Sequence, residues 1–590
     1  MGEKIFGIIS SKYARSLFKR YGFFYFLGAV VLIIVDYTQT LIPIYTGNFI
    51  DSLKSGILIK NNIMTFLYPI IFAAIFVILG RFLWRQFLMG NARKIERDIS
   101  NDVYNHLQRL GANYYSNHKT GEIMAYVTND INAIREAMGF SFVMVFDVIF
   151  LFIFTINKMI QNISLKLTLV ACIPLIFIIL VTTFLEAKIH ANFTDRQKKF
   201  SLISDFIQED LSGINVIKSF TQEKNKINQF EKVNNKYYES NLKLAQTRAL
   251  MDPLLDFIIG ISLSISIGYG GYLAIYNIIT VGEFAAFIQY LGMLVWPMMA
   301  VGFALNILTM GSASLKRVES VLNEDIEIKD VNVDNNIKTL KGDIVFRNLN
   351  FKYQDSNTPI LKNINLVIEN NKTLGIVGKT GSGKTTLVNL LVKLYNVSNN
   401  TIEIANHDIN SIPLKTLRSN ISIVSQENFL FSMNIFDNVS LKDQRFSNEQ
   451  VIESCKVACV HNDILEFTNG YETVVGERGD NLSGGQKQRI SIARALIRNP
   501  EILILDDSLS AVDTKTEDTI LKHLKEERKG KTNIIIAHRI STLKHADKIV
   551  VLDNGEIVES GSHEELMNLK ENYYRLYQEQ LLEEMEESYE

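Results

Sequence analysis

Cysteine is scarce in this sequence, and net charge is almost absent. Only Cys172, Cys455 and Cys459 occur among 590 residues, with no metal-ligand spacing that includes histidine. We therefore expect free thiols in a reducing compartment, although Cys455 and Cys459 are four residues apart and could share a helix face. The formal net charge of -2 gives no argument for nucleic acid as a partner.

Other features are also missing. The apolar span after the N-terminus has no small-residue cleavage site, which argues against a cleavable signal peptide. We find no internal repeat and no low-complexity tract. Mean hydropathy is +0.09 although 21% of the residues are charged, so apolar and charged residues are segregated along the chain. A length of 590 residues predicts several domain-sized units.

Residues 1 to about 310 hold nearly all the long apolar runs, which predicts a helical membrane domain. A bilayer core about 30 Å thick requires about 20 residues of helix. Six segments reach that length: Phe23–Ile44, Ile63–Phe87, Phe140–Ile160, Leu165–Leu185, Leu254–Tyr276 and Phe284–Leu308. The basic residues before the first span predict a cytoplasmic N-terminus; they are Lys4, Lys12, Arg15, Lys19 and Arg20.

Two connections between the spans, at about 88–139 and 186–253, are long, polar and helix-like. We expect them to be membrane helices that continue into the cytosol, because loops of this length are rarely structureless. From about Asp343 the pattern changes to short β-branched runs that alternate with helical stretches, which predicts a mostly parallel α/β sheet. The runs are Leu374–Val377, Ile421–Val424, Ile502–Leu505 and Asn533–Ala537.

A phosphate-binding loop follows the first of these strands. Gly378-Lys379-Thr380-Gly381-Ser382-Gly383-Lys384-Thr385 fits G-x-x-x-x-G-K-[ST]. Its glycines let backbone N–H groups turn toward phosphate oxygens, and the helix that follows adds its positive N-terminal end. We expect ATP as ligand, with Lys384 on the β- and γ-phosphates, Thr385 on Mg²⁺ and Thr386 beside them. Asp506 ends a later strand, where its carboxylate can hold Mg²⁺.

The order of these motifs resembles the nucleotide-binding domain of ATP-binding-cassette (ABC) transporters over about 343–580. The resemblance rests on Tyr353, the phosphate loop, Gln426, Leu482-Ser483-Gly484-Gly485-Gln486, Asp506, Asp513 and His538. It implies that Tyr353 stacks on adenine, although an ordinary strand tyrosine is the alternative. It also implies that Gln426 senses Mg²⁺ and the γ-phosphate, that His538 is the switch histidine, and that Asp513 communicates across a dimer.

The signature Leu482–Gln486 precedes a helix, so we expect free N–H groups and a hydroxyl to form an outward-facing anion site. In the family this element caps the γ-phosphate held by another subunit, so the resemblance implies a dimer. The membrane half resembles the exporter-type (type IV) half-transporters, with coupling helices near Ser116–Gly121 and Gly213–Phe220. These boundaries give a membrane domain at 1–310, a linker at 311–342, a nucleotide-binding domain at 343–580 and an acidic tail at 581–590.

Asp507 departs from the family pattern, since hydrolysing relatives nearly always have glutamate there. Glutamate is longer by one methylene, so aspartate withdraws the carboxylate by about 1–1.5 Å, a misplacement that can cost about 100-fold in rate. The chain thus resembles the degenerate-site half of bacterial heterodimeric multidrug exporters of the BmrC/BmrD type, on the BmrC side. His538 is retained, which is compatible with residual hydrolysis.

Asp36 lies in the middle of the first apolar run, where an unpaired charge costs about 3 kcal/mol or more. It could face a translocation cavity and attract cationic substrates, or it could be a helix-packing contact or a protonated acid. Asp147 and Asp256 lie nearer the cytoplasmic side, where packing or interface exposure is expected.

These observations predict an ATPase-coupled exporter of amphipathic compounds in the bacterial plasma membrane, with the lipid bilayer and a second half-transporter as partners. A heterodimer is favoured over a homodimer, and nucleic acid is not expected. The alternatives are a lipid, peptide or siderophore translocator on the same fold, and an ATP-gated regulatory subunit.

Overall fold

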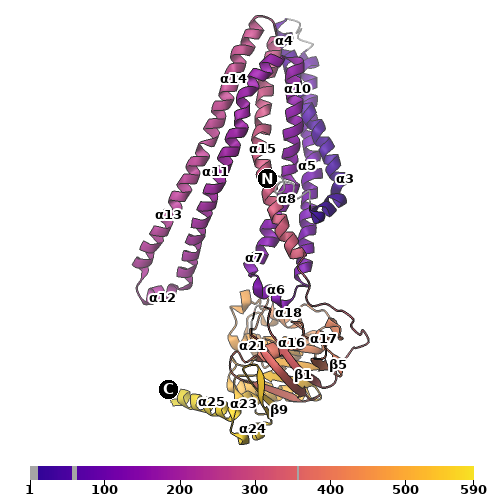
Figure 1. Cartoon of the computed structure of the whole chain (residues 1–590), viewed down its shortest axis with the longest axis vertical. Helices are drawn as coiled ribbons and strands as arrows, with labels where there is room; N and C mark the ends of the chain where they lie inside the picture. The colour runs from indigo at the N-terminus through magenta and orange to yellow at the C-terminus, as the bar shows by residue number, and fades with distance from the viewer. Residues whose placement is uncertain (1–10, 56–62, 355, 357, 590) are drawn as a thin grey trace. The chain divides into compact units, whose positions relative to one another are not determined.

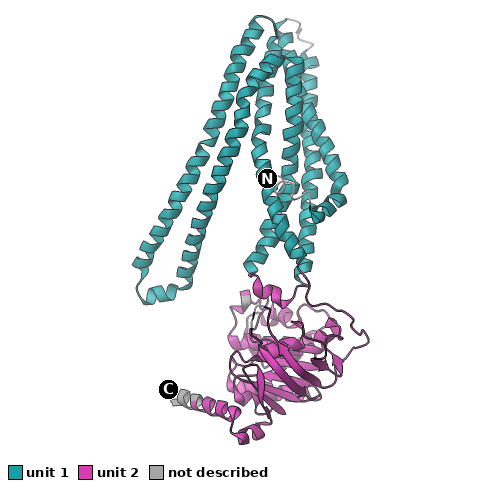
Figure 2. Ribbon diagram, viewed as in Figure 1, with its two compact units in different colours: residues 1–108, 120–324 teal, residues 109–119, 325–590 magenta. Residues whose placement is uncertain are grey.

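The computed structural model describes residues 11–55, 63–354, 356 and 358–589 of the chain. It divides into two compact units, which are described separately (Figure 2). Unit 1 comprises residues 1–108 and 120–324, and unit 2 comprises residues 109–119 and 325–590. Lys4, which contributed to the orientation prediction, lies outside the described residues.

Unit 1 is built from long helices (Figure 1). In chain order they are α3 (Lys12–Gln39), α4 (Leu41–Lys54), α5 (Ile63–Leu107), α7 (Thr120–Ala125), η1 (Tyr126–Asp130), α8 (Ile131–Met138), α9 (Phe140–Phe146), η2 (Asp147–Leu151), α10 (Phe152–Asn162), α11 (Leu165–Ser212), α12 (Ile214–Ser219), α13 (Glu223–Ala249), α14 (Met251–Ile275) and α15 (Val281–Leu322). Both η1 and η2 are π-helical turns within the third span.

Within the described residues, six helical segments are long and apolar enough to cross a membrane, as predicted. They are Lys12–Lys54, Ile63–Leu107, Thr120–Asn162, Leu165–Ser212, Glu223–Ile275 and Val281–Leu322. The outer surface is apolar, since Phe72, Ile78 and Phe82 on α5 are between 61% and 70% exposed. A lipid hydrocarbon environment accounts for such exposure, because large apolar side chains are not favourably exposed to water in such numbers. Both long connections are helical, and α11 alone runs for 48 residues.

The predicted linker at 311–342 begins too early. Helix α15 continues to Leu322, with Leu315, Val318 and Val321 buried at helical spacing. Arg317 on the same stretch binds Asp130 of η1 through its Nε at 2.9 Å. The apolar run ends near residue 310, but buried positions continue the helix beyond it, and only the residues after Leu322 lack regular structure before β1.

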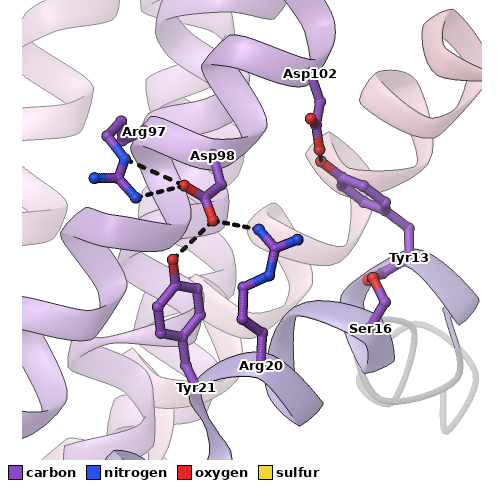
Figure 3. Close-up of polar contacts among 7 residues, drawn as sticks. All are labelled: Tyr13, Ser16, Arg20, Tyr21, Arg97, Asp98 and Asp102. Carbon is purple, nitrogen blue, oxygen red and sulfur yellow. Dashed lines mark hydrogen bonds and ion pairs between the residues drawn. The ribbon is translucent and has the colours of Figure 1, made fainter.

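A polar cluster fastens the start of α3 to α5 (Figure 3). The Tyr21 hydroxyl and Arg20 Nη1 both donate to Asp98 Oδ2, at 2.7 and 2.8 Å. One helical turn away, the Tyr13 hydroxyl donates to Asp102 Oδ2 at 2.8 Å. Arg20 is 66% exposed, so its ion pair adds little. The buried hydrogen bond from Tyr21 to Asp98 therefore stabilises the contact between α3 and α5 more than the ion pair of Arg20 does.

Unit 2 contains a six-stranded sheet in the order β10-β9-β3-β8-β7-β6, in which only β10 is antiparallel to its neighbour. Its strands are β3 (Thr373–Val377), β6 (Ile421–Val424), β7 (Ile502–Asp506), β8 (Thr532–Ile536), β9 (Lys548–Asp553) and β10 (Glu556–Gly561). A mostly parallel sheet was predicted from the β-branched runs, and it is confirmed. Because parallel strands end at one edge, Gly378, Asp507 and His538 begin their loops on the same side.

An antiparallel sheet in the order β2-β1-β4-β5 was not predicted. Its strands are β1 (Ile344–Phe351), β2 (Leu361–Ile368), β4 (Ile402–Ile404) and β5 (His407–Asp408). The helices of unit 2 are α6 (Ala112–Asn117), α16 (Lys384–Leu391), α17 (Leu414–Asn420), α18 (Ile435–Ser440), α19 (Asn448–Val457), α20 (His461–Glu466), α21 (Gly484–Leu496), α22 (Thr514–Glu527), α23 (Ile540–Leu543), α24 (His563–Leu569) and α25 (Asn572–Tyr589), with 3₁₀ turns η3 (Gly470–Glu472) and η4 (Glu477–Gly479).

Candidate nucleotide site and membrane cavity

A cavity of about 280 Å³ opens at the carboxyl ends of β3, β7 and β8. It brings together most of the residues expected to bind ATP. They are Tyr353, Thr380, Gly381, Ser382, Gly383, Lys384, Thr385, Thr386, Gln426, Asp506, Asp507 and His538. Gly378 and Lys379 complete the loop by accepting hydrogen bonds from Lys384 Nζ through their carbonyl oxygens, at 2.7 and 2.9 Å.

Two glycines in the loop leave no room for a side chain. Gly383 has φ +102°, and a Cβ there would lie 2.7 Å from Leu361 Cδ2. A Cβ on Gly378 would lie 2.1 Å from the carbonyl oxygen of Leu552 on β9. The backbone therefore turns directly from β3 into α16, whose N-terminal N–H groups face the end of the loop.

Burial shifts the pKa values of the charged groups at the base of this cavity. It lowers the pKa of Lys384, against the attraction of Asp506 and Asp507. Burial also raises the pKa of Asp506, while hydrogen bonding from Thr385 and the charge of Lys384 oppose the rise. Asp506 is 2% exposed, and its Oδ2 has no hydrogen-bond partner. An unpaired buried carboxylate oxygen beside a hydroxyl suits Mg²⁺, which prefers few protein oxygens together with phosphate oxygens.

Asp507 has an unusual backbone conformation. Its φ is +47°, a region that aspartate and asparagine enter more readily than most residues. Its N–H donates to the Ile536 carbonyl of β8 at 2.9 Å. Its carboxylate Oδ2 accepts from Gln426 Nε2 at 3.3 Å. The structure therefore places the predicted base and the predicted sensor glutamine in contact.

Tyr353 is held at the rim of the cavity. Its hydroxyl shares a hydrogen bond of 2.8 Å with Thr386 Oγ1. Phe351 and Tyr395 pack nearly perpendicular to its ring, each with a centroid distance of 5.1 Å. This packing fixes the orientation of the ring before any ligand binds.

The signature residues and Asp513 lie outside this cavity. Asp513 caps α22 by accepting from Thr516 N at 3.0 Å, and backbone hydrogen bonding lowers its pKa. Ser483 caps α21 by accepting from Gln486 N at 3.2 Å, while Gln486 Oε1 accepts from Ser483 N. The expected anion site is thus smaller than predicted, because this capping box uses two of its N–H groups and leaves those of Gly484 and Gly485.

Helix α6 lies where the first coupling helix was predicted. The sequence predicted one helix near Ser116–Gly121, but this range spans the break between α6, which ends at Asn117, and α7, which begins at Thr120. Asn113 of α6 donates to Glu327 Oε2 at 2.8 Å, and Gln354 donates to Glu327 Oε1 at 3.1 Å. Glu327 therefore joins α6 to the residue that follows Tyr353. The second predicted coupling helix coincides with α12, Ile214–Ser219.

Unit 1 contains a second cavity, of about 720 Å³, between α3, α5, η2 and α15. Asp36 lines it, is 3% exposed, and has an Oδ2 without a hydrogen-bond partner. Asp147, the first residue of the π turn η2, lines the same cavity, as does Trp296. Asp256 is exposed on α14 and is absent from the lining.

Sequence reasoning missed Arg81 and Trp84 in this cavity. Arg81 Nη2 donates to Gln39 Oε1 at 3.0 Å, and the buried Trp84 Nε1 has no partner. A charged residue inside the apolar run Ile63–Phe87 was a signal that could have identified Arg81. Trp84 gave no comparable signal, because aromatic residues are common in membrane helices.

Comparison with known protein families gives one match in the N-terminal half of the chain and one in the C-terminal half. The model described as "ABC transporter transmembrane region" matches residues 25–298, and the model described as "ABC transporter" matches residues 361–510. The chain belongs to the ABC transporter family. It is 37% identical over 567 residues to the probable multidrug resistance ABC transporter ATP-binding/permease protein YheI of Bacillus subtilis, with 96% of each chain covered.

Further relatives agree with this assignment. The ABC transporter is 34% identical to the multidrug resistance-like ATP-binding protein MdlA of Escherichia coli, with 97% of this chain and 96% of that protein covered. Its fold is similar to that of a bacterial Atm1-family ABC exporter with ATP bound. That comparison has a TM-score of 0.77 at 24% identity, and covers 94% of this chain and 99% of the other. The predicted fold class, an exporter-type membrane domain followed by an ABC ATPase, is confirmed. The ABC transporter is a multi-pass membrane protein that couples ATP hydrolysis to transport.

Proposed function

We propose that this ABC transporter is one half of a heterodimer that exports amphipathic compounds across the bacterial plasma membrane, with its ATPase domain in the cytoplasm. One observation carries the proposal of a second subunit. The signature residues Ser483–Gln486 do not line the cavity that holds the phosphate loop, Asp506, Asp507 and His538. A complete site therefore requires the signature of another chain, and this chain's signature serves the partner.

Each side chain of the nucleotide cavity has a proposed task. Lys384 and the loop amides hold the β- and γ-phosphates, and Tyr353 stacks on adenine. Thr385, Gln426 and Asp506 would hold Mg²⁺, which when bound neutralises phosphate charge. Asp507 and His538 face the γ-phosphate, with Asp507 as a base of shortened reach. Hydrolysis at this site is accordingly slow, and the partner site is the faster one.

The printed names of the relatives support multidrug export, and the membrane cavity supports an amphipathic substrate. Its lining combines Trp84, Trp296 and aliphatic side chains with a few charged groups, which are Asp36, Asp147, Arg81 and Arg85; the Oδ2 of Asp36 has no hydrogen-bond partner. Apolar walls with a few polar groups are typical of sites for small organic molecules. Lipid, peptide or siderophore transport and a purely gating role remain the competing functions to be tested.

Inside-out vesicles that contain the chain, alone or with the protein that co-purifies with it, test this proposal. We expect ATP-dependent accumulation of a fluorescent amphipathic dye only when both subunits are present. Accumulation by the chain alone at the same rate would overturn the heterodimer. ATP binding without accumulation of any dye, lipid or peptide probe would favour the gating subunit instead.

Asp36→Asn is expected to raise the KM for a monocationic dye about tenfold and to leave the KM for a neutral dye unchanged. The reason is that a hydrogen bond to a charged group contributes about 1.5 kcal/mol or more, and 1.4 kcal/mol is tenfold in affinity. Vesicle transport at several dye concentrations measures both constants. Asp256→Asn is the matched control, because this carboxylate is exposed and lies outside the cavity lining. Equal effects of Asp36→Asn on both dyes would contradict the assignment.

A further inference from the structure

The C-terminal helix contacts the loop that carries His538. Gln580 on α25 donates from Nε2 to the His538 carbonyl oxygen at 2.6 Å. The same side chain accepts from Ile540 N through Oε1 at 2.8 Å. Both hydrogen bonds go to backbone atoms, so one carboxamide spans the peptide segment on either side of Arg539.

The segment that carries His538 is short. His538 lies between the end of β8 at Ile536 and the start of α23 at Ile540. Helix α23 has four residues and no side-chain cap of its own. The first N–H groups of α23 lack intrahelical acceptors, and Gln580 Oε1 is the acceptor for one of these groups, the N–H of Ile540. The carboxamide therefore supplies the missing cap and also fixes the carbonyl of the histidine itself.

Helix α25 is firmly seated where it begins. Glu559 on β10 is 6% exposed and accepts from Asn572 N at 2.6 Å and from Tyr573 N at 3.1 Å. The Tyr573 ring is fully buried, and its hydroxyl bonds to His563 Nδ1 at 2.8 Å. Two turns of helix separate Tyr573 from Gln580, so the position of the carboxamide is set by the sheet edge through a rigid element.

On its other side, the segment faces α22. Glu517 accepts from the Thr542 hydroxyl, and its Oε2 lies 3.6 Å from Arg539 Nη1. Helix α22 begins directly after Asp513. The loop of His538 is therefore held between the helix that follows Asp513 and the C-terminal helix.

We infer that Gln580 is a positioning residue for His538, and that α25 controls how well this histidine is aimed at the γ-phosphate. The carboxamide does not line the nucleotide cavity, so it acts through the His538 backbone and not on the nucleotide. This inference holds whichever partner or substrate the transporter has. It makes α25 a part of the hydrolytic machinery and not only an appendage of the ATPase fold.

Gln580→Ala in the purified full-length chain, measured without the partner subunit so that only this chain's own site turns over, is expected to lower kcat for ATP hydrolysis about tenfold while KM for ATP changes less than about twofold. If the His538 side chain is displaced by about 1 Å, the rate of hydrolysis falls, while the nucleotide contacts elsewhere in the site are kept. Steady-state phosphate release in lipid nanodiscs measures both constants. Glu579→Ala is the matched control, since this neighbour on α25 is exposed.

A double-mutant cycle separates positioning from general stabilisation. If Gln580 acts through His538, Gln580→Ala has no further effect in a His538→Ala background, measured over long reaction times. An equal fold-loss in both backgrounds, or an unchanged kcat in the single variant, would overturn the inference. Should Gln580→Ala prove unstable, Gln580→Glu serves in its place, because it keeps the acceptor for Ile540 N and loses the donor to His538. Its kcat is expected to fall as well, and a wild-type kcat for this variant would equally overturn the inference.

Discussion

Asp507→Glu is expected to raise ATP hydrolysis by the purified chain by about tenfold to a hundredfold. The extra methylene returns the carboxylate to within reach of the attacking water, and a misplacement of about 1 Å is worth about 100-fold. The φ of +47° offsets part of this gain, because glutamate tolerates the left-handed region less well than aspartate. We therefore expect the lower part of the range.

Steady-state phosphate release at saturating ATP measures this gain in the full-length chain. Asp507→Asn is the control, since it keeps the size and the backbone preference of aspartate and removes the base. We expect its rate to fall below that of the wild type. If the unaltered chain hydrolysed ATP as fast as the Asp507→Glu variant, this residue would not limit the site and the asymmetric model would fail.

Gly485→Asp is expected to lower the rate of ATP hydrolysis at the partner's site by about 100-fold or more. A Cβ on Gly485 would lie 3.0 Å from the Ala511 carbonyl oxygen, so the backbone at one of the two residues would have to give by a few tenths of an ångström. The added carboxylate would also face the γ-phosphate where the Gly484 and Gly485 N–H groups are expected. Loss of one preorganised donor at a developing negative charge costs about 10²–10³ in rate.

The assembly of both subunits allows the two sites to be distinguished. We expect Lys384→Ala, which disables this chain's own phosphate loop, to leave most of the ATPase activity in place. Gly485→Asp in the same chain should abolish most of it. Gly484→Ala is a milder change in the same signature, because its Cβ would make only an ordinary 3.4 Å contact with Ala511 and adds no charge. The opposite order of losses would show that the fast site lies on this chain's own phosphate loop.

The sequence predicted the six spans and the parallel sheet because both depend on long local patterns. Apolar runs of bilayer length need no partner to be identified, and β-branched strands buried on both faces are continuous apolar segments. The phosphate loop was equally local. Its glycines, lysine and threonine are consecutive, and the structure places them around one cavity with Asp506, Gln426 and His538.

Features that depend on distant contacts or single-residue geometry were not predicted. Strands β4 and β5 have only three and two residues, which is too short for an alternating pattern. Gln580 stands in a polar, acidic helix and meets a loop 42 residues away, so nothing near it in the sequence marks its role. The capping box of Ser483 and Gln486 was visible as S-x-x-Q, but family resemblance drew attention to phosphate instead.

The π turn η2 of the third span has a consequence for how such transporters diverge. A π turn holds one residue more than an α turn, and both ends of η2, Asp147 and Leu151, line the cavity. Deleting a single residue from Asp147–Leu151 would let the helix close in the regular way, and the residues that follow would keep nearly their present faces, because the wider π turn already takes up the extra residue. A one-residue gap at this place in the alignment of two relatives would therefore mark the loss of the π turn and a local change of the cavity wall near Asp147, with the rest of the span facing as before.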